Sequence, residues 1–330
     1  MKRIIKGSVA LSLGVALVAS LSGCSDGPGS SSDQSSTAAS GEDNGIDIQK
    51  VTTFDEIEPY PEVQALVPER IANEKITVAL SAAAPPTTFI GADGKTSLGL
   101  NADVTRALIR IMGLDAELTS VPFDGIIPGL ASEKYQWSMA SMSPTAERLE
   151  VLDMVAFTKG GTSIAVPDGN PKDLTVDTLC GLRMAVGVGT IQATRQLPDF
   201  SEDLCESQGK EAIVPVEVPN PNQALLALSS GRVDAFMGDG VPLAYAEQMN
   251  SGEFDILEHD SLNEGSSRDS ALEVTLGAMA VPKDSDFTPA LVEAMKVLQS
   301  LPQYQEIYDR WGMGDYALAE DEVIQIVTGK

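Results

Sequence analysis

The segments KITVAL (75–80), NADVTRALIRIMG (101–113) and DAELTSV (115–121) decide the fold of this chain. The first contains a β-branched run typical of a strand, and the third also reads as a strand. Between them, four apolar residues recur at the i, i+4, i+7 and i+8 spacing of one helical face: Val104, Leu108, Ile111 and Met112. Gly113 ends this helix. The stretch therefore predicts the order strand, helix, strand.

The same alternation continues along the chain. Further strands are predicted at 135–140, 164–166, 182–188, 212–218, 233–237 and 276–281. Further helices are predicted at 124–130, 191–197, 222–230, 288–300 and 304–311, with Asp124 and Thr288 as N-caps. Two such series, 75–165 and 168–275, indicate an α/β fold with largely parallel sheets in two lobes. Ligands of such sheets bind beyond the carboxyl ends of strands, which selects the loops 81–89, 141–148, 189–192 and 238–240.

Composition and charge limit the class of protein. The chain has 330 residues, 43% of them hydrophobic, which is enough for one large domain or two ordinary ones. Its 22 basic and 48 acidic residues give a net charge of −26 at pH 7. Binding to nucleic acid or to an anionic membrane surface needs a cationic face, so neither partner is expected. The single histidine, His259, is expected at the surface. One histidine and three cysteines are too few for a Cys/His zinc cluster once Cys24 is assigned elsewhere, and they make a histidine-based catalytic triad a poor candidate. We therefore expect no metal and no cofactor.

The N-terminus has the pattern of an export signal. Three basic residues stand within the first six, and an apolar stretch follows at 9–21 that is too short to span a bilayer comfortably. The ending Leu-Ser-Gly-Cys at Cys24 resembles a bacterial lipoprotein signal, in which the cysteine becomes the lipidated first residue. We therefore expect a signal peptide at 1–23, and a flexible tether at 24–45 that anchors the chain to the outer face of the cell membrane through lipid. An ordinary signal peptide with a chance cysteine is the alternative.

Two further cysteines, Cys180 and Cys205, remain once Cys24 is assigned to lipid. In an exported protein such a pair favours a disulfide over a metal site. Closing a loop of about 25 residues would stabilise the fold by roughly 3 kcal/mol. A free or redox-active pair stays open as an alternative, although no CxxC spacing is present.

Several motifs in a fixed order resemble those of one family. The segments are Gly99–Val104, Phe123–Leu130, Ser141–Arg148, Leu179–Thr190, Ser230–Asp239 and Trp311–Gly312. They are similar to those of the extracellular solute-binding proteins of family 3, the amino-acid receptors of ABC importers, over about residues 70–315. The first segment departs at Asn101 and Ala102 from the family's usual Gly-aromatic-Asp-aliphatic-Asp-aliphatic signature.

The resemblance implies a two-lobed periplasmic-binding-protein-like fold of type II, with a hinge and a ligand cleft between the lobes. The first lobe would comprise 75–166 and 280–330, and the second 167–279. Residues 46–74, acidic and rich in proline, would form an N-terminal arm along the surface that ends in a short helix at 68–73. Lobe closure about the hinge would trap the ligand.

The resemblance also implies a site for a zwitterion. Arg148 matches the family's carboxylate-binding arginine, and a planar guanidinium suits that two-pronged contact. Asp239 matches the acid that binds the ligand ammonium, whose transfer from water needs an opposite charge. A site that holds both charges distinguishes an amino acid from a simple anion.

Six further positions match ligand contacts of the family: Ser81, Phe123, Ser141, Ser143, Thr190 and Ile191. Ser143 would bind with its hydroxyl and N–H, Ser141 with its carbonyl, and the loop at Thr190 and Ile191 with N–H groups near a helix start. Phe123 would pack on the ligand side chain. The family often has an acid where this chain has Ser81, so a neutral polar, acidic or bulky side chain is expected rather than a basic one.

These observations favour a monomeric binding protein, not an enzyme, that presents an amino acid to the permease subunits of an ABC importer. The chain has no Gly-x-x-x-x-Gly-Lys-Ser/Thr phosphate loop, so it is not the importer's ATPase. A ligand-sensing lipoprotein is one alternative. A dehydratase of cyclic amino-acid precursors on the same fold is another, since fold does not fix function.

Overall fold

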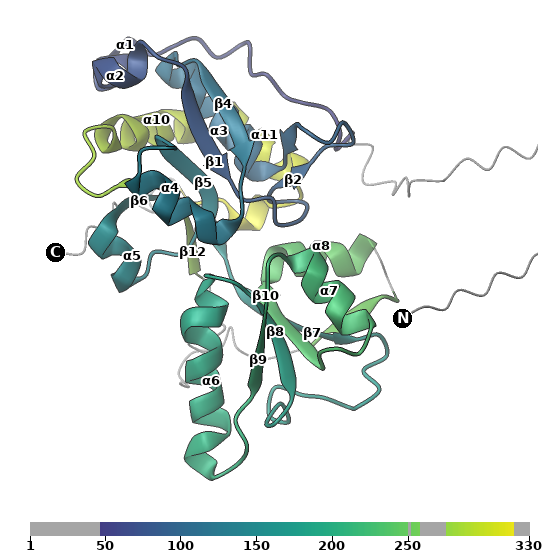
Figure 1. Ribbon diagram of the computed structural model, residues 1–330. Helices are drawn as coiled ribbons and strands as arrows, with labels where there is room; N and C mark the ends of the chain where they lie inside the picture. Colours follow the sequence, from purple (N-terminus) through teal and green to yellow (C-terminus); the bar gives the residue numbers. More distant parts are fainter. Residues whose placement is uncertain (1–46, 250–251, 258–274, 320–330) are drawn as a thin grey trace, which may run out of the picture. The chain divides into compact units, whose positions relative to one another are not determined.

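The computed structural model describes residues 47–249, 252–257 and 275–319, all within one compact unit (Figure 1). The first of two five-stranded sheets has the order β4-β1-β5-β12-β6. Its strands are β1 (Ile76–Leu80), β4 (Ala116–Ser120), β5 (Trp137–Met142), β6 (Leu152–Gly160) and β12 (Thr275–Pro282). The strands β4, β1 and β5 are parallel, whereas β12 is antiparallel to both of its neighbours. A short hairpin, β2 (Phe89–Ile90) with β3 (Ser97–Leu98), lies outside this sheet.

The second sheet has the order β11-β7-β10-β8-β9. Its strands are β7 (Thr162–Pro167), β8 (Arg183–Gly187), β9 (Val214–Val218), β10 (Ala235–Asp239) and β11 (Phe254–Ile256). The strands β10, β8 and β9 are parallel, and β7 is antiparallel to β10 and β11. The fold class is therefore confirmed, with the qualification that both sheets are mixed rather than uniformly parallel.

Helices cover both faces of the first sheet, as the alternation of its side chains requires. Val78 packs with α3 (Leu100–Met112), α10 (Thr288–Ser300) and α11 (Pro302–Arg310). The adjacent Ala79 faces the opposite cluster, which includes α4 (Ile126–Ala131) and α5 (Ala146–Val151). The helix predicted from the apolar spacing is thus confirmed, and Gly113 adopts the left-handed conformation (φ 67°) that ends it.

The second sheet is covered in the same way. One cluster of buried residues includes α6 (Leu197–Leu204), and the other includes α7 (Pro221–Ser229) and α8 (Gly240–Met249). A π-helical turn, Gln192–Gln196, precedes α6, and a 3₁₀ turn, Glu206–Gln208, follows it. Cys180 and Cys205 form a disulfide beside α6, as predicted.

The sheets do not divide at the predicted lobe boundaries. β7 belongs to the second sheet from Thr162, and β12 belongs to the first sheet from Thr275. The first crossing of the chain therefore lies at Gly161, earlier than the predicted 166/167 boundary. The predicted 279/280 boundary falls inside β12.

Several local predictions are corrected. The strand β6 and the helix α8 were not predicted, and α6 extends well beyond Leu197. Asp124 lies inside a 3₁₀ turn, Phe123–Gly125, and caps no helix with its side chain. Thr288 is the first residue of α10 rather than its cap, and its hydroxyl donates a hydrogen bond to Asp153 (3.1 Å).

The N-terminal arm contributes to the core rather than only lying along the surface. It contains α1 (Pro61–Gln64) and α2 (Glu69–Ala72), the latter within the predicted short helix. Its buried apolar side chains join the cluster around α3: Phe54, Ile57, Val63, Val67 and Ile71. The predicted signal peptide 1–23, the tether 24–45 with Cys24, and His259 lie outside the described residues. Among the described helices, none combines the length and apolar character needed to cross a bilayer.

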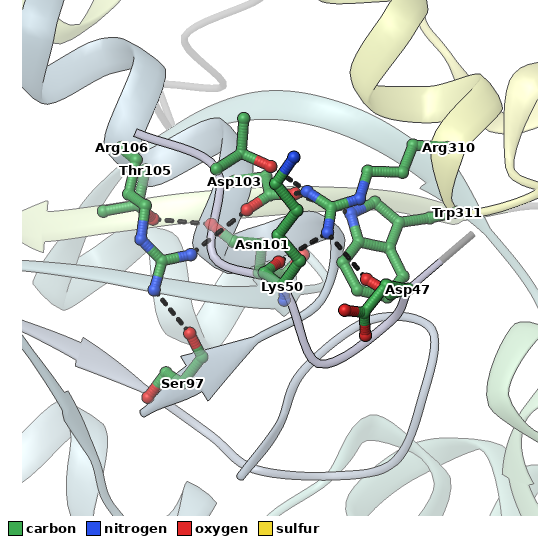
Figure 2. A network of polar contacts seen from close by, with 10 residues as sticks. Asp47, Lys50, Ser97, Asn101, Asp103, Thr105, Arg106, Arg310 and Trp311 are labelled. Atoms are coloured by element: carbon green, nitrogen blue, oxygen red, sulfur yellow. Dashed lines mark hydrogen bonds and ion pairs between the residues drawn. The ribbon is translucent and has the colours of Figure 1, made fainter. Parts of the chain in front are cut away.

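A buried ion network joins this arm to the start of α3 and the end of α11 (Figure 2). The carboxylate of Asp103 is 1% exposed and accepts hydrogen bonds from Arg106 (3.1 Å), Arg310 (3.0 Å) and the indole N–H of Trp311 (2.9 Å). Arg310 also donates to the carbonyl of Asp47, at 3.3 Å. One carboxylate therefore fixes the first turn of α3 relative to two distant segments.

We predict that Asp103→Ala destabilises the protein by about 3–5 kcal/mol, because it leaves two largely buried arginines without their shared anion. Asp286→Ala is the matched control, since it removes an exposed ion pair with Arg70 and should cost less than about 1 kcal/mol. Urea unfolding of both variants measures the difference. Equal losses would show that the Asp103 network does not hold these segments together.

Candidate ligand-binding site

The eight residues predicted to contact ligand all line one cavity of about 400 Å³. They are Ser81, Phe123, Ser141, Ser143, Arg148, Thr190, Ile191 and Asp239. The lining comes from the carboxyl ends of parallel strands of both sheets, as expected for an open α/β fold. A cavity of this volume is in the range of small-molecule sites.

Arg148 lies on α5, where the hydroxyl of Thr145 caps the helix by accepting from the Arg148 N–H (3.3 Å). Its guanidinium donates to the carbonyl of Ser143 (2.8 Å) and to that of Gly189 (3.0 Å), and it lies 5.5 Å from the centre of the Phe123 ring. The residue is 7% exposed, and no carboxylate among the described residues forms a hydrogen bond or ion pair with it. Burial lowers its pKa to about 10, against a smaller opposite effect of the neighbouring Glu147 charge, so it remains a cation at neutral pH. Within the described residues, the cavity thus holds a buried positive charge to which no anion bonds.

Asp239 is the last residue of β10 and directly precedes α8, so it does not lie in a loop as predicted. Its carboxylate accepts one long hydrogen bond, from the Val241 N–H at 3.4 Å, and no described cation pairs with it. Burial raises its pKa to about 6. The pKa of Tyr316 is also raised, first by burial and second by the charge of Asp239. A cation bound beside Asp239 would relieve this unfavourable burial of charge.

Ser141 occupies strand β5 rather than the predicted loop, in a backbone conformation unusual for serine (φ 47°). The pairing of β5 with β12 shifts register here, which is the signature of a bulge that redirects a side chain. Its hydroxyl donates to Oδ1 of Asn101 (3.0 Å). Gly277 permits the close approach, because a Cβ there would lie 3.2 Å from that of Ser141 and 2.6 Å from a methyl of Thr158.

Thr190 lies at the turn that precedes the π-helical segment. Its hydroxyl donates to the carbonyl of Gly187 (2.7 Å), and its backbone N–H donates to the same carbonyl (3.2 Å). The N–H predicted to bind a ligand carboxylate is therefore engaged within its own turn in this structure. Ile191 follows directly and also lines the cavity.

Sequence reasoning missed other residues of the lining, among them Thr88, Asn101, Lys159 and Gln192. Asn101 departs from the family's signature, but its position in the first turn of α3 could have placed it near the strand ends. Thr88 has no local sequence signal, because only the fold brings it to the cavity. Within the described residues, no cluster of His, Cys, Asp or Glu could hold a metal ion.

Comparison with known proteins defines the class. The family model of bacterial extracellular solute-binding proteins, family 3, matches residues 76–314, and the chain belongs to this family. The arginine-binding protein ArgT of Corynebacterium glutamicum is 29% identical over 264 residues, which cover 80% of this chain and 83% of that protein. The family and ArgT are both binding proteins rather than enzymes.

Two solved structures share the fold. An ancestral arginine-binding protein bound to arginine matches with a TM-score of 0.61 and 25% identity. The match covers 72% of this chain and 97% of the ancestral protein. The arginine-, lysine-, histidine-binding protein ArtJ from Geobacillus stearothermophilus matches with a TM-score of 0.63 and 22% identity. The match covers 76% of this chain and 100% of ArtJ. The two-lobed fold of periplasmic amino-acid-binding proteins is therefore confirmed.

The raised pKa of Asp239 predicts how stability depends on pH. The folded chain holds the proton more tightly than the unfolded chain, so Asp239 costs stability as pH rises from about 4 to about 6. We predict that Asp239→Asn increases the free energy of unfolding of the ligand-free protein at pH 7 by up to about 3 kcal/mol, and hardly at pH 4. Denaturant unfolding at both pH values measures this.

Asp234→Asn is the control of opposite sign. Hydrogen bonds from Arg183 and, less strongly, Lys172 hold the pKa of Asp234 below its ordinary value. This substitution should destabilise the protein at pH 7, and the loss should shrink in acid. If Asp239→Asn were also destabilising at pH 7, the burial of an unpaired charge at Asp239 would be refuted.

Proposed function

We propose that the protein is a lipid-anchored, monomeric receptor on the outer face of the cell membrane that binds an α-amino acid in this cavity. It would deliver the amino acid to the permease subunits of an ABC importer. The observation that carries the proposal is the pair of opposite, unpaired charges, Arg148 and Asp239, in one cavity. The family match and the functions of the similar proteins support amino-acid binding and an importer as partner.

The two charges suit a zwitterion. A ligand carboxylate can take two parallel N–H bonds from the guanidinium of Arg148, in place of the carbonyls that hold it now. A ligand ammonium can pair with Asp239 and lower its pKa. A simple carboxylic acid would neutralise only Arg148, and a simple amine only Asp239, so each would leave a buried charge unpaired.

The remaining predicted contacts complete this picture. Phe123 stacks on Arg148 and forms an apolar surface of the cavity beside it. Ser141 and Ser143 present polar groups from the end of β5, while Thr190 and Ile191 approach from the second lobe. Contacts from both lobes would tie ligand binding to closure about the hinge.

The proposal predicts that an amino acid raises the melting temperature of the purified protein, whereas its decarboxylated and deaminated analogues do not. A ligand present at 100 times its dissociation constant stabilises the folded state by about 2.7 kcal/mol, or roughly 4–5 °C for a chain of this size. Arg148→Lys keeps the charge but loses the planar fork, and should weaken binding at least tenfold. Equal binding of the deaminated acid would contradict the role of Asp239, and no response to any amino acid would overturn the proposal.

Anchoring is tested separately. The wild-type chain should sediment with membranes, whereas Cys24→Ala should be released in soluble form or retain its signal segment. If Cys24→Ala stays membrane-bound with its signal peptide removed, the lipid anchor is refuted without affecting the ligand site. If loss of the chain leaves uptake of its amino acid unchanged in cells, the sensing role replaces the transport role.

A further inference from the structure

One side of the cavity has no charged side chain. We define the first-sheet wall as the polar lining residues around the ends of β1 and β4 and the start of α3: Ser81, Thr87, Thr88, Asn101 and Ser120. Ala82, Ala83, Val121 and Pro122 line the cavity beside them. The hydroxyl and amide groups of the five polar residues are the side-chain hydrogen-bonding groups of this wall.

Thr88 is the first indication of a ligand group. It is 0% exposed and lines the cavity, yet its hydroxyl has no hydrogen-bond partner among the described residues. A buried hydroxyl without a partner is unfavourable, and a bound ligand atom would satisfy it. The hydroxyl of Thr88 can either donate or accept.

Asn101 is the second indication. Its Oδ1 accepts from the Ser141 hydroxyl at 3.0 Å, while its Nδ2 donates to no described residue. The N–H groups of Leu100 and Asn101 are not free to bind a ligand, because they bond to the carbonyls of Pro86 (2.9 Å) and Thr87 (3.0 Å). The side chains of Asn101 and Thr88 supply this wall with a donor and a group able to accept.

The charges in the cavity also favour a neutral ligand side chain. Asp239 is the one carboxylate in the described lining, and a bound amino acid would use it for its ammonium. A guanidinium or ammonium side chain would bring a second cation with no second anion, at a cost in desolvation. Lys159 is the second cationic residue of the described lining, and it already has an interaction of its own. It therefore gives no reason to expect an anionic ligand side chain.

We infer that the cavity selects an amino acid with a neutral side chain that both donates and accepts hydrogen bonds, a carboxamide or ureido group, and that Thr88 and Asn101 determine this specificity. The inference rests on the proposed function, because it assumes that Arg148 and Asp239 hold the amino-acid head group. It separates this chain from the relatives whose names specify arginine.

Calorimetry with matched ligands tests the inference. L-Citrulline and L-arginine have the same length and differ in the terminal group, which is neutral in the first and cationic in the second. L-Glutamine and L-glutamate provide the corresponding neutral and anionic pair. We expect the better of the two neutral ligands to bind at least tenfold more tightly than arginine and than glutamate.

Other outcomes overturn the inference in distinguishable ways. If arginine or glutamate binds as tightly as its neutral counterpart, the selectivity is wrong but the amino-acid receptor stands. If none of the four binds while another amino acid binds in an Arg148-dependent manner, the side-chain class is wrong. If no amino acid binds, the proposed function fails as well.

Three variants test the residues themselves. Thr88→Val is isosteric and removes only the unpartnered hydroxyl, so it should weaken neutral-ligand binding at least fivefold without lowering the melting temperature of the ligand-free protein. Ser97→Ala is the matched control, since the Ser97 hydroxyl is equally buried and unpartnered but lies outside the cavity lining, and this variant should leave affinity unchanged.

Asn101→Asp tests the second residue. The new carboxylate can still accept from Ser141 and adds a negative charge, so it should shift the citrulline-to-arginine affinity ratio toward arginine. Unchanged neutral-ligand affinity in Thr88→Val, or an unchanged ratio in Asn101→Asp, would overturn the assignment.

Discussion

The proposed site depends on one buried guanidinium, that of Arg148, to which no carboxylate of the described residues bonds. Arg148 is held by the carbonyl of Ser143 in the first lobe and by that of Gly189 in the second. Neutral carbonyls satisfy its N–H groups but do not cancel its charge. Asp239 supplies a separate negative site in the same cavity. Under the proposed function, a bound amino acid would neutralise both charges.

The fold explains how distant residues reach this place. Ser81, Ser120 and Asp239 all lie at the carboxyl ends of parallel strands, which face the cavity. The bulge at Ser141 turns the end of β5 toward the same cavity. The ion network of Asp103 fixes the first turn of α3, two residues beyond Asn101. The stability of this helix start and the shape of the cavity are thus linked, because the residue that anchors the helix lies two positions from one that lines the cavity.

The sequence was informative where local pattern and fold agree. The spacing of Val104 and Leu108 predicts α3, and the rule for strand ends brings all eight predicted residues to one cavity. It failed for β6, whose residues are buried almost throughout and give no alternation, and for α8, whose apolar residues are not confined to one face. Thr88 could not have been predicted, because its unpartnered hydroxyl exists only once the loop between β1 and β2 has folded.

We expect the ligand ammonium to bind the ionised form of Asp239. Calorimetry at pH 6 in buffers of different ionisation enthalpy measures the protons exchanged on binding. Because the pKa of Asp239 in the ligand-free protein is about 6, binding of the tightest amino acid should release about half a proton at pH 6 and almost none at pH 8. Asp239→Asn should abolish the release. Proton uptake, or no exchange at pH 6 in a protein that binds the amino acid, would contradict the account.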